Sequence, residues 1–293
     1  MPYWLNRILT RPRAVFRALR KVGLRATLSL IRIRLGSSDR IYPVKVPQWP
    51  EPVLVRGGNS TDTTVLYELL VTGEYDVLKA LDPPRTIIDG GANIGLTALT
   101  FLERYPAAQV ISVEPFPETF EVCQKNLARF GSRAVAVQGA IWPHAGRVCL
   151  DPQGEDWANR VRAEEDGHGS TVEAFTMSSL IAAAGGTVDL FKLDVEGSEK
   201  EIFGYGSEEW LPHVRNVIIE VHGPDCKDRV FEALAPYDYE LSNHDNVYFC
   251  KNLRARRTTV AADLAALESA LTARDIVSSE AAEELVLPSG AAG

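Results

Sequence analysis

The sequence predicts an α/β protein with a doubly wound, mostly parallel seven-stranded sheet and a helical extension at its N-terminus. Three observations predict this fold class. Short β-branched runs alternate with helical stretches along residues 85–250, and this alternation is typical of a parallel sheet covered by helices on both faces. A glycine-rich turn follows the first run, at 90–95. Several runs end in a carboxylate, at the sheet edge where open α/β folds bind ligands.

The length and composition indicate one large globular domain with appendages. The chain has 293 residues, of which 45% are hydrophobic and 24% are charged, an ordinary globular composition. We expect three parts. They are a basic helical segment with a linker at 1–60, an α/β domain at 61–252, and a C-terminal tail at 253–293 that is partly helical or disordered.

The charge is distributed unevenly along the chain. Residues 1–40 contain ten Lys and Arg against one acidic residue, Asp39, whereas the remainder contains 21 basic and 38 acidic residues. An acidic body would repel a polyphosphate, so no nucleic-acid partner is expected. Any anionic partner should instead meet the basic segment.

The basic segment shows helical spacing of apolar residues at 3–35, with Pro12 as a predicted interruption. Residues 1–40 could bind a membrane surface or a protein partner, or they could pack on the acidic body or form a disordered leader. No apolar run is long enough to span a bilayer, and arginines interrupt any secretory signal. We therefore expect a cytoplasmic protein, peripheral to a membrane if this segment binds lipid.

The first half of the domain follows a linker. Residues 43–60 are rich in proline and glycine, which predicts an irregular approach. β-branched runs and amphipathic spacing then predict the elements up to the third strand. In order, they are a helix at 62–79, a strand at 86–89, a helix at 96–105, a strand at 110–114, a helix at 117–130 and a strand at 134–138.

The second half begins with an insertion at 147–175 that has hairpin character and a polar loop at 154–169. The pattern of strands and helices then resumes. The predicted elements are a helix at 176–184, a strand at 188–194, a helix opening at 196–199, a strand at 216–221, a helix at 225–234 and closing strands at 239–242 and 246–250.

The turn after the first strand is the candidate cofactor loop. Glycine allows positive φ and close approach of a ligand, and the following helix N-terminus attracts a carboxylate such as that of an amino-acid cofactor. The G-G-x-x-x-G spacing does not match the dinucleotide pattern G-x-G-x-x-G. The candidate cofactor-binding residues of the loop are Asp89, Gly90, Gly91, Asn93 and Gly95.

Asp89 and Glu114 suggest which cofactor the loop serves. A carboxylate at Asp89 would repel a pyrophosphate, but it could accept from the ammonium of a methionine group, directly or through water. Glu114 ends the next strand, where an acidic residue binds ribose hydroxyls in nucleotide sites generally. Gly139 and Ala140, after the third strand, are expected on the adenine side. Together these features favour S-adenosylmethionine over NAD.

The chemical part of the site is expected at the ends of the fourth and fifth strands. His222 is the best candidate general base by its intrinsic pKa, and Asp194 is the alternative, as base or as the group that orients one. Asp194, Glu220 and His222 could instead bind Mg²⁺ or another divalent cation, or His222 could be structural. The sequence leaves these alternatives open.

Three further charged residues lie close to the fourth strand. Lys192 lies inside the strand, where an unpaired charge would be costly, so we expect it to pair with Asp194 or Glu220 in a structural or a catalytic role. Glu196 and Glu199 are expected in the first turn of a helix, which favours acids through its dipole. A site role is expected for Glu196 and a purely helical one for Glu199.

With these motifs in view, the sequence resembles the FkbM family of methyltransferases over residues 62–250. The pattern K-x-D-x-E-G-x-E at 192–199, at this distance from the D-x-G-x-N-x-G loop, is the most specific part of the resemblance. The matching stretches are Glu68 with 73–75, the loop 89–95, Val113-Glu114-Pro115, Asn126, 191–199 and 219–222.

The resemblance implies a Rossmann-like class I methyltransferase domain at 61–252 that uses S-adenosylmethionine and O-methylates a small molecule. The implied acceptor is a hydroxyl of a sugar, a polyketide or another secondary metabolite. The resemblance adds Pro115 to the cofactor-binding residues. It leaves open N- or C-methylation on the same fold, a noncatalytic binding protein with a degenerate fold, and a homo-oligomer.

Overall fold

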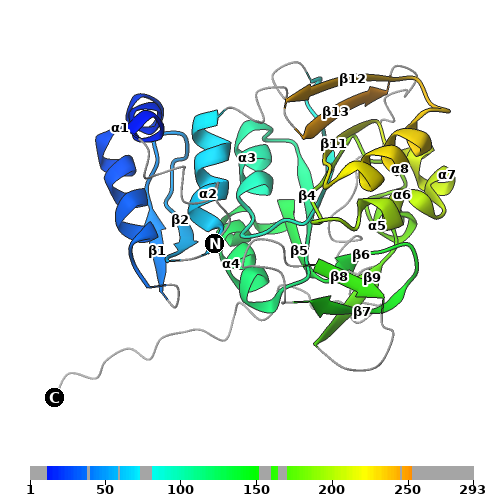
Figure 1. Ribbon diagram of the computed structural model, residues 1–293, viewed down its shortest axis with the longest axis horizontal. Helices are drawn as coiled ribbons and strands as arrows, with labels where there is room; N and C mark the ends of the chain where they lie inside the picture. Colours follow the sequence, from blue (N-terminus) through cyan, green and yellow to red (C-terminus); the bar gives the residue numbers. More distant parts are fainter. Residues whose placement is uncertain are drawn as a thin grey trace.

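The structure is a computed structural model that describes residues 12–37, 40–58, 60–72, 81–151, 160–163, 170–244 and 246–252. Its centre is a seven-stranded sheet in the order β12-β13-β11-β10-β3-β4-β5 (Figure 1). The strands are β3 (Thr86–Gly90), β4 (Gln109–Glu114), β5 (Ala134–Gln138), β10 (Leu190–Leu193), β11 (Asn216–Glu220), β12 (Tyr239–His244) and β13 (Val247–Asn252).

The strand directions confirm the predicted doubly wound sheet. Strands β5, β4, β3, β10 and β11 are mutually parallel, whereas β13 pairs antiparallel with both β11 and β12. The order of the strands reverses between β3 and β10. In open parallel sheets, ligands bind at the carboxyl edge beside such a reversal. The strand order therefore places the candidate site at the ends of β3 and β10.

Helices cover both faces of the sheet because successive strand residues point to opposite sides. Ile87 packs with α3 and α4, whereas its neighbour Ile88 packs with α5, α6 and α8. Burying each such side chain contributes about 1.5–3 kcal/mol. The helices are α3 (Leu96–Arg104), α4 (Pro117–Leu127), α5 (Met177–Ala183), α6 (Glu199–Gly204), α7 (Ser207–Trp210) and α8 (Pro224–Leu234).

The N-terminal helix α1 (Pro12–Arg34) joins the same core as α3 and α4. Its backbone departs from helical geometry at Gly23, where φ is 82° and ψ is 171°, so the kink comes at a glycine inside the helix. The buried side of α1 consists of Ala18, Val22, Ala26, Thr27, Leu30 and Ile33. Of the alternatives left open by the sequence, packing on the body is therefore observed for residues 12–34.

The stretch predicted as an irregular linker contains a β-hairpin, so that prediction is wrong for part of its length. Strand β1 (Ile41–Val44) pairs antiparallel with β2 (Val53–Arg56), and Val44 lies opposite Val53. Proline is compatible with this two-stranded sheet because an edge strand leaves some N–H groups unpaired. Next come α2 (Asp62–Tyr67) and a π-helical turn, Glu68–Thr72.

The predicted insertion forms, together with the short strand β6 before it, a second, four-stranded sheet in the order β6-β9-β7-β8. Its strands are β6 (Ala140–Ile141), β7 (Gly146–Asp151), β8 (Arg160–Ala163) and β9 (Thr171–Phe175). The hairpin character is confirmed by the antiparallel pairing of β7 with β8. Part of the predicted polar loop is thus strand β8, and the remainder lies outside the described residues.

The two ends of the chain are only partly described. The predicted tail at 253–293 and residues 1–11 fall outside the described ranges. Within those ranges, no helix combines the length and the apolar character needed to cross a bilayer.

Candidate active site

The candidate cofactor loop lies directly against the end of β10. Gly91 has a φ of +69°, and a Cβ atom there would lie 1.7 Å from the carbonyl oxygen of Asp194. The backbone N–H groups of Gly91 and Ala92 both donate to the carbonyl of Val113 at 3.0 Å. The loop is therefore fixed between two strands, and only glycine fits at position 91.

Glu114 holds the loop from the end of β4. One of its carboxylate oxygens accepts from the backbone N–H of Asn93 at 2.8 Å, and the other accepts from that of Phe116 at 3.0 Å. The side chain is buried, and burial raises its pKa to about 7. Glu114 thus organises the loop, while its predicted contact with a ribose stays a prediction.

Lys192 supports the loop from β10. Its Nζ lies 3.3 Å from Asp89 Oδ1 and donates to the carbonyl of Gly91 at 2.8 Å. The predicted pairing with Asp194 is present at a longer distance, 3.9 Å. The shorter pairing with Asp89 was not predicted, although it follows from strand register, because Lys192 and Asp89 are partners across β10 and β3.

Asp89 itself is fully buried. Burial raises the pKa of its carboxyl group, and the charge of Lys192 partly offsets that effect. In this conformation Asp89 presents no surface to a ligand. It therefore supports the loop through Lys192, and its predicted contact with the ammonium of a cofactor stays a prediction.

Four other predicted cofactor residues, Asn93, Pro115, Gly139 and Ala140, lie beside Glu114. The N–H of Gly139 donates to the backbone carbonyl of Glu114 at 3.1 Å, which places Gly139 and Ala140 beside the end of β4. Asn93 has a φ of 51°, and its side-chain oxygen accepts from the N–H of Ile94 at 2.8 Å. Pro115 is half-buried next to Glu114. The predicted adenine and ribose sides of the site are thus adjacent.

A second group of polar side chains surrounds His222, just beyond the end of β11. The Nδ1 atom of His222 lies 2.8 Å from Glu199 Oε1. Its Nε2 atom lies 3.4 Å from Glu196, 3.7 Å from Glu220 and 3.9 Å from Asp194. The predicted residues Asp194, Glu196, Glu220 and His222 are therefore brought together, and the fully buried Glu199 is an addition.

These carboxylates determine the protonation of His222. Burial alone would lower its pKa, but the hydrogen bond to Glu199 and the surrounding negative charges outweigh burial and raise the pKa to about 9. Burial, together with the charge of Asp194, also raises the pKa of Glu196 to about 8. The imidazole is thus mostly protonated at neutral pH, so it is not the free base that its intrinsic pKa suggested.

The turn between β10 and α6 corrects two predictions. Glu196 adopts a φ of +52° and is followed by Gly197 at +105°, and α6 begins only at Glu199. Glu196 is therefore in a turn and not in the first turn of a helix. Glu199 does begin the helix as predicted, but its carboxylate also pairs with His222. No local sequence signal indicates this pairing, because it depends on the adjacency of β10 and β11.

The same cluster contains the predicted metal ligands. One ligand atom from each of Asp194, Glu220 and His222 can be chosen so that all three lie within 4.8 Å of one another. Because Glu199 occupies Nδ1, the ligand atom of His222 would be Nε2. The carboxylate donors suit a hard divalent cation, but the imidazole must lose its proton to bind one. The residues therefore fit a cation without requiring it.

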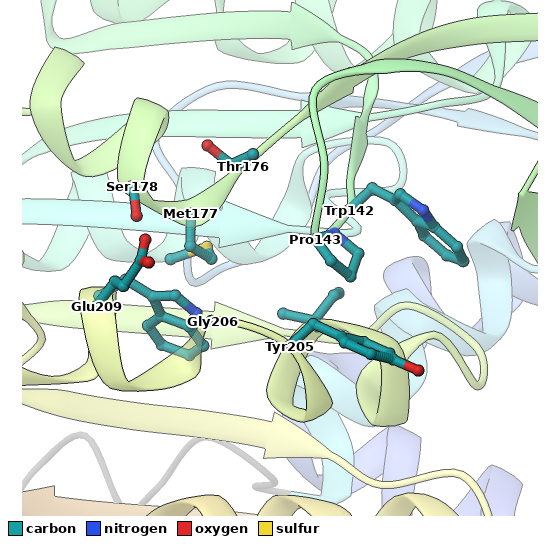
Figure 2. Close-up of a pocket in the computed structure, with 10 residues that line it drawn as sticks. Trp142, Pro143, Thr176, Met177, Ser178, Tyr205, Gly206 and Glu209 are labelled. Carbon is teal, nitrogen blue, oxygen red and sulfur yellow. The ribbon is translucent and has the colours of Figure 1, made fainter.

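A hollow that is open to solvent is lined by a different set of residues. In Figure 2, Trp142 and Tyr205 lie on one side of it and Ser178 and Glu209 on the other. It is formed by the end of β6, the start of α5, and α6 with α7. None of the predicted site residues lines it, so it offers positions for control substitutions.

The part of the chain that contains the cofactor loop and the His222 cluster is similar to known proteins. Residues 89–248, which include the loop and the His222 cluster, match the family described as the methyltransferase FkbM domain. The chain belongs to this FkbM family. Its methyltransferase character and its Rossmann-like fold are those predicted from the sequence, and such proteins in general use S-adenosylmethionine.

Several relatives are similar over the same region. Methyltransferase sdnD from Sordaria araneosa is 29% identical over 194 residues, which cover 55% of this chain and 74% of the relative. Hexuronic acid methyltransferase AglP from Haloferax volcanii is 28% identical over 166 residues, which cover 53% and 66%. The 31-O-demethyl-FK506 methyltransferase FkbM from Streptomyces tacrolimicus is 24% identical over 217 residues, which cover 62% and 83%.

Among solved structures, methyltransferase FkbM from Methylobacillus flagellatus aligns with a TM-score of 0.44 and 16% identity. The alignment covers 65% of this chain and 53% of that protein. The chain therefore spans about half the length of this structural relative.

Proposed function

We propose that this FkbM-family protein is an S-adenosylmethionine-dependent O-methyltransferase that acts on a hydroxyl of a small molecule, such as a sugar, a polyketide or another secondary metabolite. The observation that carries the proposal is the proximity of two groups of residues at one sheet edge. The candidate cofactor loop, which Glu114 and Lys192 hold in place, lies at the ends of β3 and β4. The His222 cluster lies at the ends of β10 and β11. Lys192 and Asp194 connect the two groups.

The cofactor would lie along the loop, with Glu114 on its ribose side and Gly139 and Ala140 on its adenine side. S-adenosylmethionine supplies a methyl group that is already activated on a sulfonium, so the protein has mainly to position the acceptor and remove its proton. The loop fits this role because its backbone is held by Glu114 and Lys192. Helix α3 begins directly after the loop at Leu96, and the N–H groups of its first turn favour a carboxylate.

The acceptor hydroxyl would bind beside the His222 cluster, at the same sheet edge as the cofactor loop. Since Glu199 holds Nδ1, the Nε2 atom of His222 is the nitrogen directed toward Asp194, Glu196 and Glu220. A neutral imidazole can take the hydroxyl proton at Nε2, and Glu199 then stabilises the imidazolium. Because the pKa of His222 is raised to about 9, the active neutral form increases with pH across the physiological range.

Two alternatives depend on the same cluster. Its negative charge would attract an ammonium group, which would first have to give a proton to one of these carboxylates or to neutral His222 so that its nitrogen could accept the methyl group. N-methylation is therefore the second candidate function. A divalent cation at Asp194, Glu220 and His222 would acidify the acceptor hydroxyl directly. The name of the FK506 methyltransferase indicates an oxygen acceptor for that relative, which supports the proposal of O-methylation here.

The proposal is tested by incubating the protein with methyl-labelled S-adenosylmethionine and a panel of hydroxyl compounds, each paired with its amino analogue. We expect label in a hydroxyl compound, loss of transfer in His222→Gln, and normal transfer in Glu209→Gln, whose exposed side chain lines the separate hollow. Label found only in amines would overturn O-methylation. A parallel reaction with EDTA reports whether a cation is required.

A further inference from the structure

The solvent-exposed face of α1 combines basic and large apolar side chains. The helix contains no acidic residue in its sequence. Six of its basic side chains are exposed, namely Arg13, Arg17, Arg20, Lys21, Arg25 and Arg32. None of these six makes an ion pair within the described residues. Their charge is therefore not neutralised by the part of the acidic body that the structure describes.

Large apolar side chains lie among these arginines. Phe16 is 60% exposed, Leu24 is 61% exposed and Leu28 is 55% exposed. Leu35, just after the helix, is 81% exposed. Of the seven large hydrophobic residues that are exposed in the described ranges, five lie between residues 16 and 41. Single exposed apolar residues are ordinary, but such clustering marks an interaction surface.

The opposite side of α1 is buried against the body, so the exposed side chains cannot turn inward. In the half after Gly23, Leu24 and Leu28 are one turn apart on the outer side, while Ala26 and Leu30 are buried. Figure 1 shows α1 at one end of the molecule, beyond α2 and the hairpin. The outer face is thus accessible to a large flat partner without obstruction from the described residues.

We propose that the outer face of α1 binds an anionic membrane surface. The occupant is identified by charge and by apolar area together. Anionic lipid headgroups attract Lys and Arg close to the surface, and Phe and Leu enter the boundary between headgroups and acyl chains. A nucleic acid would use the arginines but would leave Leu24 and Leu28 exposed. The acidic remainder of the chain would keep the rest of the molecule away from such a surface.

This inference goes beyond methyl transfer and does not depend on it. The contacts on the outer face of α1 involve none of the loop residues and none of the His222 cluster. The protein can therefore fail to bind vesicles and still bind S-adenosylhomocysteine, or the reverse, so each proposal can fail separately.

The test is flotation of the full chain with vesicles of phosphatidylcholine alone and of phosphatidylcholine mixed with phosphatidylglycerol. We expect binding only to the mixed vesicles, weakened by salt because surface charges are screened. The triple variant Phe16→Ser/Leu24→Ser/Leu28→Ser should lower the partition coefficient at least about tenfold. These side chains are largely exposed, so the fold should persist, as circular dichroism can verify.

A charge variant and a matched control complete the design. Arg17→Glu/Arg20→Glu should also lower binding at least about tenfold, whereas the double variant Tyr205→Ser/Leu241→Ser, which removes exposed apolar side chains elsewhere, should bind like the original chain. No binding to anionic vesicles would overturn the proposal. The proposal would also be overturned if the apolar triple variant bound anionic vesicles as well as the original chain does, or if the chain bound duplex DNA as tightly as vesicles. Either result would indicate a general polyanion site.

Discussion

At the residue scale, the loop depends on buried side chains that form hydrogen bonds with backbone groups in and beside it. Glu114 accepts from two backbone N–H groups, and Lys192 donates to a loop carbonyl. A buried charged group left without its partner costs several kcal/mol. Substitutions at these positions should therefore disturb the loop even without any ligand, and stability must be measured beside affinity.

Gly91 offers a direct test of the loop geometry. In Gly91→Ala the new Cβ would lie 1.7 Å from a carbonyl oxygen, so we expect loss of S-adenosylhomocysteine affinity and a clearly lower melting temperature. Gly206→Ala is the matched control, because Gly206 has a φ of +68° and a Cβ added there would have no atom within 4 Å. The control should lose only about 1 kcal/mol, from backbone strain. Equal effects in the two variants, measured by calorimetry, would contradict the geometry.

Glu199 is predicted to act on the reaction through His222. Its hydrogen bond and charge raise the pKa of His222, so Glu199→Gln should lower that pKa. If His222 is the base, the rise of methyl transfer with pH should move to lower pH by at least about one unit. The measurement is the pH–rate profile of both forms, with Glu209→Gln as control. A lower rate of methyl transfer with an unchanged pH–rate profile would show that Glu199 has only a structural role.

At the element scale, one side chain joins three segments around the loop. Asn126, on α4, accepts from the N–H of Leu54 at 2.7 Å and donates to the carbonyls of Leu54 at 3.0 Å and Ile94 at 2.8 Å. The resemblance included Asn126, but no role for it follows from the sequence alone. The structure shows that it attaches the N-terminal hairpin to the end of the cofactor loop.

Replacing Asn126 should therefore loosen the hairpin and the loop together. Asn126→Ala leaves buried backbone groups of Leu54 and Ile94 without their partner, at a cost of about 2–4 kcal/mol. Chemical denaturation should show this loss, and hydrogen exchange should increase in both segments. Thr100→Ala is the control, because it removes only a hydrogen bond from the Thr100 hydroxyl to a backbone carbonyl within α3. It should change exchange in neither the hairpin nor the loop. Faster exchange in the hairpin alone would contradict the connection to the loop.

The elements that the sequence predicted well are those set by local pattern. The seven strands of the main sheet and helices α3, α4, α5 and α8 follow from β-branched runs, apolar spacing and terminating Gly or Pro residues. The hairpin β1–β2 was missed because Pro43, Pro47 and Pro50 indicated a loop. The interruption predicted at Pro12 falls where the described part of α1 begins and stays a prediction, whereas the kink at Gly23 was not predicted.

The site was predicted as a set of residues but not as a network. Strand ends bring Asp89, Glu114, Asp194 and His222 to one edge, as expected from the topology. The pairing of Lys192 with Asp89, and that of His222 with Glu199, depend on register between strands that are far apart in sequence. The raised pKa of His222 follows from that packing, so residue type alone could not predict it.

At the scale of the whole molecule, the buried titrating groups predict how stability depends on pH. The pKa of His222 is about 9 in the folded state, above its ordinary value of 6.5, so its stabilising contribution is present below pH 6.5 and is lost as pH rises through 9. The pKa values of Glu114 and Glu196 are also raised, to about 7 and about 8. All three groups therefore favour the folded state at the acidic side of this range.

We accordingly expect the melting temperature to fall between pH 6.5 and pH 9, at constant ionic strength. The loss should amount to a few kcal/mol, since a tenfold change in proton affinity corresponds to about 1.4 kcal/mol. Glu196→Gln removes one titrating group and should make the fall shallower, whereas Glu209→Gln should not. The measurement is scanning calorimetry across this range. A melting temperature that rises toward pH 9 would contradict the prediction.

The central claim, that this fold binds S-adenosylmethionine at the loop after β3, is tested most directly by calorimetric titration with S-adenosylhomocysteine. The folded wild-type chain should bind it in the micromolar range, Gly91→Ala should not, and Gly206→Ala should bind like the wild type. NAD, titrated in parallel, should give no heat of binding. A folded wild-type chain that does not bind S-adenosylhomocysteine, or that binds NAD instead, would contradict the assignment of the loop and of every catalytic role that depends on it.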